Sequence, residues 1–163
     1  MTLHDFGDGP VPAHRHPNGG GWVADTATVD DTAYVGPDAT VAGRATVAGR
    51  ATVAGRATVI DHARVGGRAA VIDHAAVFGG AVVGDHAVVF GEAQISGYAE
   101  IYGDATVGGR ATVYDHATVS GSARVYDHAA VEDSATVSDH AEIYGFAVIG
   151  GDHSVFGGEF KGE

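Results

Sequence analysis

The sequence predicts an all-β fold, a single-stranded parallel β-helix, and two observations carry that prediction. Val or Ile occupies every sixth position from Val23 to Val155, in 23 consecutive positions without an insertion. Ala lies four residues after each aliphatic residue, in 21 consecutive positions from Ala27 to Ala147. A fixed short period indicates identical units stacked along one axis. An α-helix does not fit the period, because residues six apart would spread around its surface.

Each six-residue unit divides into a short strand and a corner. In a strand such as Ala57–Val59, the alternation directs Ala and Val inward and the middle residue outward. The next three residues, such as Ile60–His62, then form the corner. We expect one corner residue to need a positive φ angle, which Gly adopts freely and which Asn, Asp and His tolerate.

Units such as V-x-G-R-A-T and I-D-H-A-R-V resemble those of the hexapeptide-repeat superfamily, whose members form left-handed parallel β-helices. The resemblance covers about residues 22–157. It implies that three units make one triangular coil of 18 residues, giving roughly seven coils and a rod of ~35 Å. The resemblance predicts the fold of the scaffold and does not predict a functional site.

A second period, of twelve residues, supports an alternative fold. In a flattened two-sided solenoid with twelve-residue coils, side chains twelve apart would stack as ladders. The aromatic series is Phe78, Phe90, Tyr102, Tyr114 and Tyr126, and the imidazole series are His62, His74 and His86, then His116, His128 and His140.

The two ends depart from the repeat, as the open ends of a solenoid must. We expect residues 1–21 to cap the first coil, residues 22–157 to form the β-helix and residues 158–163 to be a C-terminal tail. Large residues replace small ones near the C-terminal end and are expected to cover the last coil: Phe146, His153, Phe156 and Phe160.

Composition limits the functions open to the chain. Without cysteine, the 163 residues cannot form a disulfide, a thiolate metal site or a cysteine nucleophile. The net charge of −12 makes nucleic acid an unlikely partner, and no segment is apolar enough to enter a membrane. Since residues 1–21 also lack the features of a signal peptide, we expect a cytoplasmic protein. The charge is uneven, because segment 39–72 carries five Arg against one Asp.

Ten histidines suggest metal binding or acid–base chemistry. Six of them occur as Asp-His-Ala at a corner, where a turn explains the pair. In a triangular coil His62 and His116 share one side of the rod about 14 Å apart, too far to bind one ion. His14 and His16 could chelate, but two ligands are too few and capping explains them better. Metal binding by the Asp-His corners therefore stays open.

The resembled superfamily includes enzymes with sites between the subunits of a trimer, namely γ-class carbonic anhydrases and acyltransferases. Resemblance to the carbonic anhydrases would imply closely spaced histidine ligands. Resemblance to the acyltransferases would imply a catalytic His and a loop that interrupts the β-helix. This chain has neither, so no catalytic or cofactor-binding residue is assigned and no cofactor is expected.

The sequence therefore favours a noncatalytic scaffold that binds another protein or associates with copies of itself. Such self-association includes the formation of a trimer. The alternative is an acyltransferase-like or metal-dependent enzyme with sites between subunits. A lesser alternative is ice binding, suggested by the outward threonines Thr40, Thr46, Thr52 and Thr58.

Overall fold

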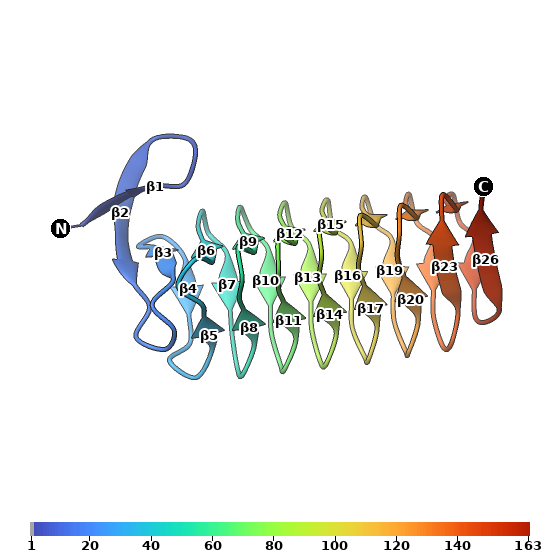
Figure 1. The fold of residues 1–163 in the computed structure, drawn as a ribbon, viewed down its shortest axis with the longest axis horizontal. Helices are drawn as coiled ribbons and strands as arrows, with labels where there is room; N and C mark the ends of the chain where they lie inside the picture. The colour runs from blue at the N-terminus through green and yellow to red at the C-terminus, as the bar shows by residue number, and fades with distance from the viewer. Residues whose placement is uncertain (1) are drawn as a thin grey trace.

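The computed structural model describes residues 2–163 and is an all-β parallel solenoid of eight coils. Figure 1 shows one straight rod with the chain ends at its two ends. Residues 18 apart pair in register from coil to coil, as Arg64 pairs with Val82 and Val82 with Glu100. This confirms the coil of 18 residues. The alternative coil of twelve residues is wrong, because the ladder hydrogen bonds join every third unit and not every second one.

Three parallel sheets of eight strands each form the sides of the rod. The first sheet contains β3 (Trp22–Ala24), β6 (Thr40–Val41), β9 (Thr58–Val59), β12 (Ala76–Val77), β15 (Gln94–Ile95), β18 (Thr112–Val113), β21 (Ala130–Val131) and β24 (Val148–Ile149). The second contains β4 (Thr28–Val29), β7 (Thr46–Val47), β10 (Arg64–Val65), β13 (Val82–Val83), β16 (Glu100–Ile101), β19 (Thr118–Val119), β22 (Thr136–Val137) and β25 (Ser154–Val155). The third contains β5 (Tyr34–Val35), β8 (Thr52–Val53), β11 (Ala70–Val71), β14 (Val88–Val89), β17 (Thr106–Val107), β20 (Arg124–Val125), β23 (Glu142–Gly145) and β26 (Glu159–Gly162).

The three corners are named by the sheets that they join. The first corner leads from the first sheet to the second, the second corner from the second sheet to the third, and the third corner back to the first sheet. Each corner continues the hydrogen bonding between coils, as when the N–H of His62 donates to the carbonyl of Gly79 at 2.8 Å. Corner side chains therefore also line up in columns along the rod.

The core consists of the two inward positions of each unit. From Ala33 to Ile143 every repeat Ala and every repeat Val or Ile is 1% exposed or less. Because these residues are small and stack on their own kind, each coil packs only against the coils beside it, as in other solenoids. The predicted inward positions are thus confirmed.

The N-terminal segment covers the open edge of the first coil. Strands β1 (Leu3–Asp5) and β2 (Pro10–Arg15) form an antiparallel hairpin that extends the first sheet beyond β3. The segment after β2 covers the third sheet, where Val35 donates to the carbonyl of Asn18 and accepts from the N–H of Gly21. The hairpin rises above the rod at its N-terminal end (Figure 1).

The last coil differs from the others. Strand β26 pairs with β23, so residues 158–163 include one more strand of the third sheet. Phe160 pairs with Ile143, one residue fewer than a full coil away. The expectation that Phe146 and Phe156 cover the end is wrong, because both side chains are 62% exposed. Both occupy corner positions, which point away from the core.

Candidate functional site

The corners depend on a left-handed residue, and in seven of them that residue is Asp. Their φ angles lie between 56° and 63°, and glycines occupy the same position in most other corners. The expectation of a positive φ is confirmed for the Gly or Asp position and not for the His that follows it. Asp tolerates this conformation better than most side chains, since its carboxylate forms local hydrogen bonds.

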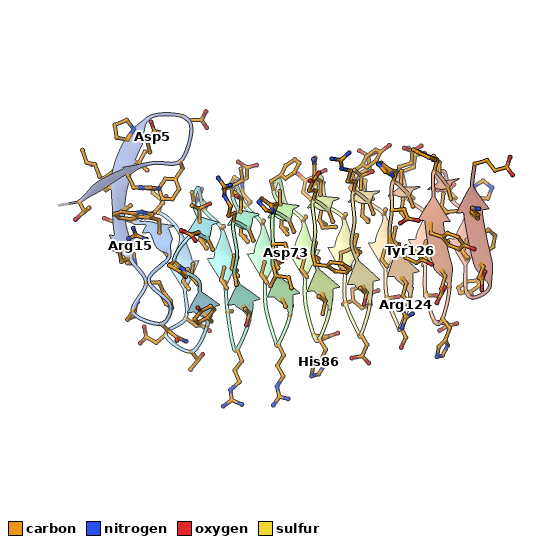
Figure 2. All side chains as sticks on the ribbon, viewed as in Figure 1. Asp5, Arg15, Asp73, His86, Arg124 and Tyr126 are labelled. Carbon is orange, nitrogen blue, oxygen red and sulfur yellow. The ribbon has the colours of Figure 1, made fainter. Side chains whose placement is uncertain are left out.

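Several of these aspartates also hold the next coil. The carboxylate of Asp73, labelled in Figure 2, accepts the backbone N–H of Gly91 at 3.1 Å. Asp61, Asp85, Asp127 and Asp133 accept the N–H of the glycine one coil on in the same way. In four of the six Asp-His corner pairs, those of Asp61, Asp73, Asp85 and Asp127, the Asp is therefore a structural residue in both its backbone and its side chain.

The six corner histidines are distributed over all three corners. His62 and His116 lie on the first corner, His86 and His140 on the second, and His74 and His128 on the third, each pair three coils apart. That separation is about 14 Å at the strand spacing. Within residues 2–163 no three His, Asp or Glu residues are grouped closely enough to hold a metal ion. The expected separation of His62 and His116 agrees with the 18-residue coil.

His14 and His16 of the N-terminal segment have different partners. The Nδ1 atom of His14 lies 2.8 Å from the carboxylate of Asp25, and both side chains are about half exposed. His16 is buried, and its Nε2 donates to the carbonyl of Ala33 at 3.0 Å. The capping role expected for His16 therefore has a structural basis, and the two rings do not converge on one ligand.

Aromatic rings stack along the corners, but with a spacing of 18 residues and not twelve. The stacked pairs are Tyr98 with His116, Tyr126 with Tyr144, and His128 with Phe146, with ring centroids 4.9 to 5.3 Å apart. The twelve-residue series instead alternates between corners, so Phe90 and Tyr126 lie two coils apart. A search for aromatic residues 18 apart would have found the stacks.

Two tyrosines of the third corner have altered acidity. Partial burial raises the pKa of Tyr126, and the charge of Glu142 adds to this effect. The pKa of Tyr144 is raised chiefly by its hydrogen bond to Glu159, at 3.1 Å. In the N-terminal hairpin, hydrogen bonds from the N–H groups of Gly7 and Gly9 hold the pKa of Asp5 below its usual value.

The basic segment becomes a patch on one side of the rod. Arg44, Arg50 and Arg56 occupy the three corners of one coil, and Arg64 and Arg68 follow on the next coil. Arg44, Arg50, Arg64 and Arg68 all lie on the second sheet or at its two corners. Among the residues of the structure, none of these four has a carboxylate within 4.0 Å.

The arginines of the C-terminal half are paired instead. The guanidinium of Arg110 lies 2.8 Å from Glu92, and that of Arg124 lies 3.5 Å from Glu142. Arg124 is labelled in Figure 2 on the outer side of the rod. The unpaired arginines are thus confined to the N-terminal half.

A hollow of about 590 Å³ lies on the first corner between His62 and Tyr98, where Gly79 and Gly80 carry no side chain. The outward threonines of the ice-binding alternative are also dispersed. Thr40 and Thr58 are neighbours on the first sheet, whereas Thr46 and Thr52 lie on the other two. The four do not form one array.

No helix in the described part of the chain is long and apolar enough to cross a membrane. The chain matches no model of a known protein family, and a search of the curated proteins finds no relative.

Proposed function

We propose that this protein is a noncatalytic β-solenoid of the hexapeptide-repeat type, a rigid scaffold whose exposed sides bind a protein partner or a second copy. The observation that carries the proposal is the uninterrupted repeat. From Val23 to Ile149 no loop leaves the rod, and consecutive coils keep the same register.

A uniform rod spreads its polar side chains apart. Acid–base and nucleophilic catalysis need groups that converge within hydrogen-bond reach of one reacting atom. Here the polar contacts between side chains are mostly pairs on neighbouring coils, such as Arg110 with Glu92 and Tyr144 with Glu159. Pairs of this kind stabilise the surface and give no shared site for a substrate.

The surface does offer features that suit a macromolecular partner. Outward side chains line up in straight columns spaced by the coil repeat, as Thr28 and Thr46 do on the second sheet. The unpaired arginines of the second sheet and its corners give that side a local charge opposite to the net charge of −12. A flat surface with charge of both signs is suited to binding another protein.

Binding of an acyl donor tests this proposal against the enzymatic alternative. Isothermal titration calorimetry with acetyl-CoA is expected to give no saturable heat for the wild-type protein. A variant with all six corner histidines changed to Asn serves as the control, since their exposed rings can be replaced without opening the core. Saturable binding of acetyl-CoA by the wild type that this variant loses would overturn the noncatalytic reading. The same outcome for stoichiometric zinc would also overturn it.

A further inference from the structure

The outward residues of the second sheet form a self-complementary series. Pairing between coils places them in one column in the order Thr28, Thr46, Arg64, Val82, Glu100, Thr118, Thr136 and Ser154. From Thr28 to Thr136 the column reads the same in both directions from Val82, except that Arg on one side corresponds to Glu on the other, and Ser154 in the last coil has no counterpart. Figure 1 shows the middle of this sheet as the row β7, β10, β13, β16 and β19.

The flanking corners repeat this relation about the same coil. On the second corner His86 is at the level of Val82, with Arg68 one coil before it and Asp104 one coil after it. On the first corner Arg44 lies two coils before Gly80, and His116 lies two coils after it, next to Asp115 in the chain. Arg64 and Arg68 therefore each have an acidic counterpart at the mirrored position, and Arg44 has an acidic residue beside its mirrored position.

From this symmetry we infer that the second sheet binds the second sheet of another copy of this chain, with the two rods antiparallel. The assignment names the partner of the proposed scaffold and rests on that function. A twofold axis that runs along the strand direction through Val82 places the second sheets of the two copies face to face. It also makes the two rods run in opposite directions. It sets Arg64 against Glu100 of the other copy and Val82 against its equivalent. It also sets Arg68 against Asp104, and Arg44 against His116 and the neighbouring Asp115.

Within the described chain Arg44, Arg64 and Arg68 have no carboxylate within 4.0 Å, whereas Asp104 lies 4.0 Å from the Nδ1 atom of His86. Arg64 and Glu100 are both exposed, and the coil of Val82 separates them within one chain. The third sheet differs, because its charged pair, Arg124 and Glu142, lies on adjacent coils and is paired within the chain. The eight parallel strands of the first sheet carry no charged outward residue. Only the second sheet has separated charges of opposite sign about a central apolar residue.

The symmetry also selects the orientation. In a two-fold dimer or a three-fold trimer of parallel rods, residues at the same level of each rod would meet. Arg64 of one copy would then face Arg64 of another. Like charges placed together oppose association. The antiparallel arrangement satisfies every charge in the column and places threonines opposite threonines, where hydroxyl groups can exchange hydrogen bonds.

The size of the interface determines the expected affinity of the dimer. Overlap of seven coils is about 34 Å long at the strand spacing, and a side of the rod is roughly 16 Å wide. The dimer would bury about 1,000 Å² in total, at the low end for specific interfaces. We therefore expect a reversible dimer that weakens with salt, because its ion pairs are screened within about 10 Å at moderate ionic strength.

Sedimentation velocity of charge-reversed variants tests the inference. The wild type is expected to reach twice its 16.4 kDa mass as concentration rises at low salt. Arg64→Glu and Glu100→Arg should each raise the dissociation constant at least tenfold, because each brings like charges together twice. An equimolar mixture of the two variants should form a heterodimer, since Glu at position 64 of one variant then meets Arg at position 100 of the other, and the native Glu100 and Arg64 meet in the second contact. Arg56→Glu, which makes the same charge change on the third corner, should leave the wild-type constant unchanged.

Three results would overturn the inference. These are a wild type that stays monomeric at every concentration, a trimer of 16.4 kDa subunits, or a mixture of the two variants that does not associate. A monomer that also fails to bind acetyl-CoA would remove the partner assignment and leave the scaffold function standing. Histidine-dependent binding of acetyl-CoA would remove the scaffold function whatever the oligomeric state.

Discussion

The carboxylate of Asp73 accepts the backbone N–H of Gly91, one coil further along the rod, at 3.1 Å. Asp73 itself has a φ of 63°, a conformation that usually requires glycine. The residue therefore has two effects of opposite sign, because its backbone conformation costs energy and its side chain stabilises the next coil. Glycine at this position would remove both.

Replacement of Asp73 by Gly is expected to destabilise the protein relative to the matched change Asp115→Gly. Asp115 has a φ of 58°, and the residue above it is Asp133, so no such bond to a glycine is lost there. The relief of backbone strain is the same in both variants. The difference in the free energy of unfolding, measured with urea, should be about 1 kcal/mol, the contribution of one exposed hydrogen bond. Equal stabilities would show that the carboxylate only tolerates the turn.

Substitution of Val89 by Asp should unfold much of the rod. Val89 is fully buried in the middle of the core, and an isolated carboxylate there has no partner. We expect a loss of more than about 4 kcal/mol. Val88→Asp is the matched control, because Val88 lies on the same strand and faces outward. A circular-dichroism melt in which both variants resemble the wild type would contradict the inward assignment.

The fold was predictable because the same six-residue pattern of Val and Ala recurs along the chain. The positions of Val and Ala fix which residues face inward, and both classes are buried from Ala33 to Ile143. The coil length was harder to predict, since units of six fit coils of twelve or 18 equally well. The decision depends on interior volume, and three short sides enclose the space that Val and Ala fill.

The surface could be predicted only in part from sequence. The basic character of segment 39–72 is plain, but its position on the second sheet follows from the coil length. The same holds for Arg64 and Glu100, which are 36 residues apart and become mirror positions only when Val82 lies between them. Capping by His16 depends on a bend of the chain that no repeat specifies.

Removal of the His16 ring should loosen the first coil without unfolding the rod. The carbonyl of Ala33 accepts from both His16 and Asn18, and His16 is 3% exposed. In His16→Ala we expect faster hydrogen exchange at the N–H of Val35, which donates to Asn18, and unchanged exchange at Val89. His14→Ala, at an exposed position, should alter neither amide. Unchanged protection of Val35 in the His16 variant would show that the backbone alone holds the cap.

Ionisation of Tyr144 offers a test of the C-terminal coils. The hydrogen bond to Glu159 stabilises the protonated phenol, so the folded pKa of Tyr144 lies above its ordinary value of 10.0. The stability from this bond is therefore complete below pH 10 and is lost as the pH rises through the folded pKa. Glu159→Gln should lower the pKa, read as the phenolate absorbance that Tyr144→Phe removes.

Tyr126 should respond less to its own carboxylate than Tyr144 does. Burial, and not the charge of Glu142, is the larger cause of its raised pKa. Glu142→Gln is thus expected to lower the pKa of Tyr126 only in part, whereas Glu132→Gln, a matched change elsewhere on the rod, should leave both tyrosines unchanged. If Glu159→Gln left the titration of Tyr144 at its wild-type position, β26 would not lie beside β23 in solution, and the eighth coil would end at Val155.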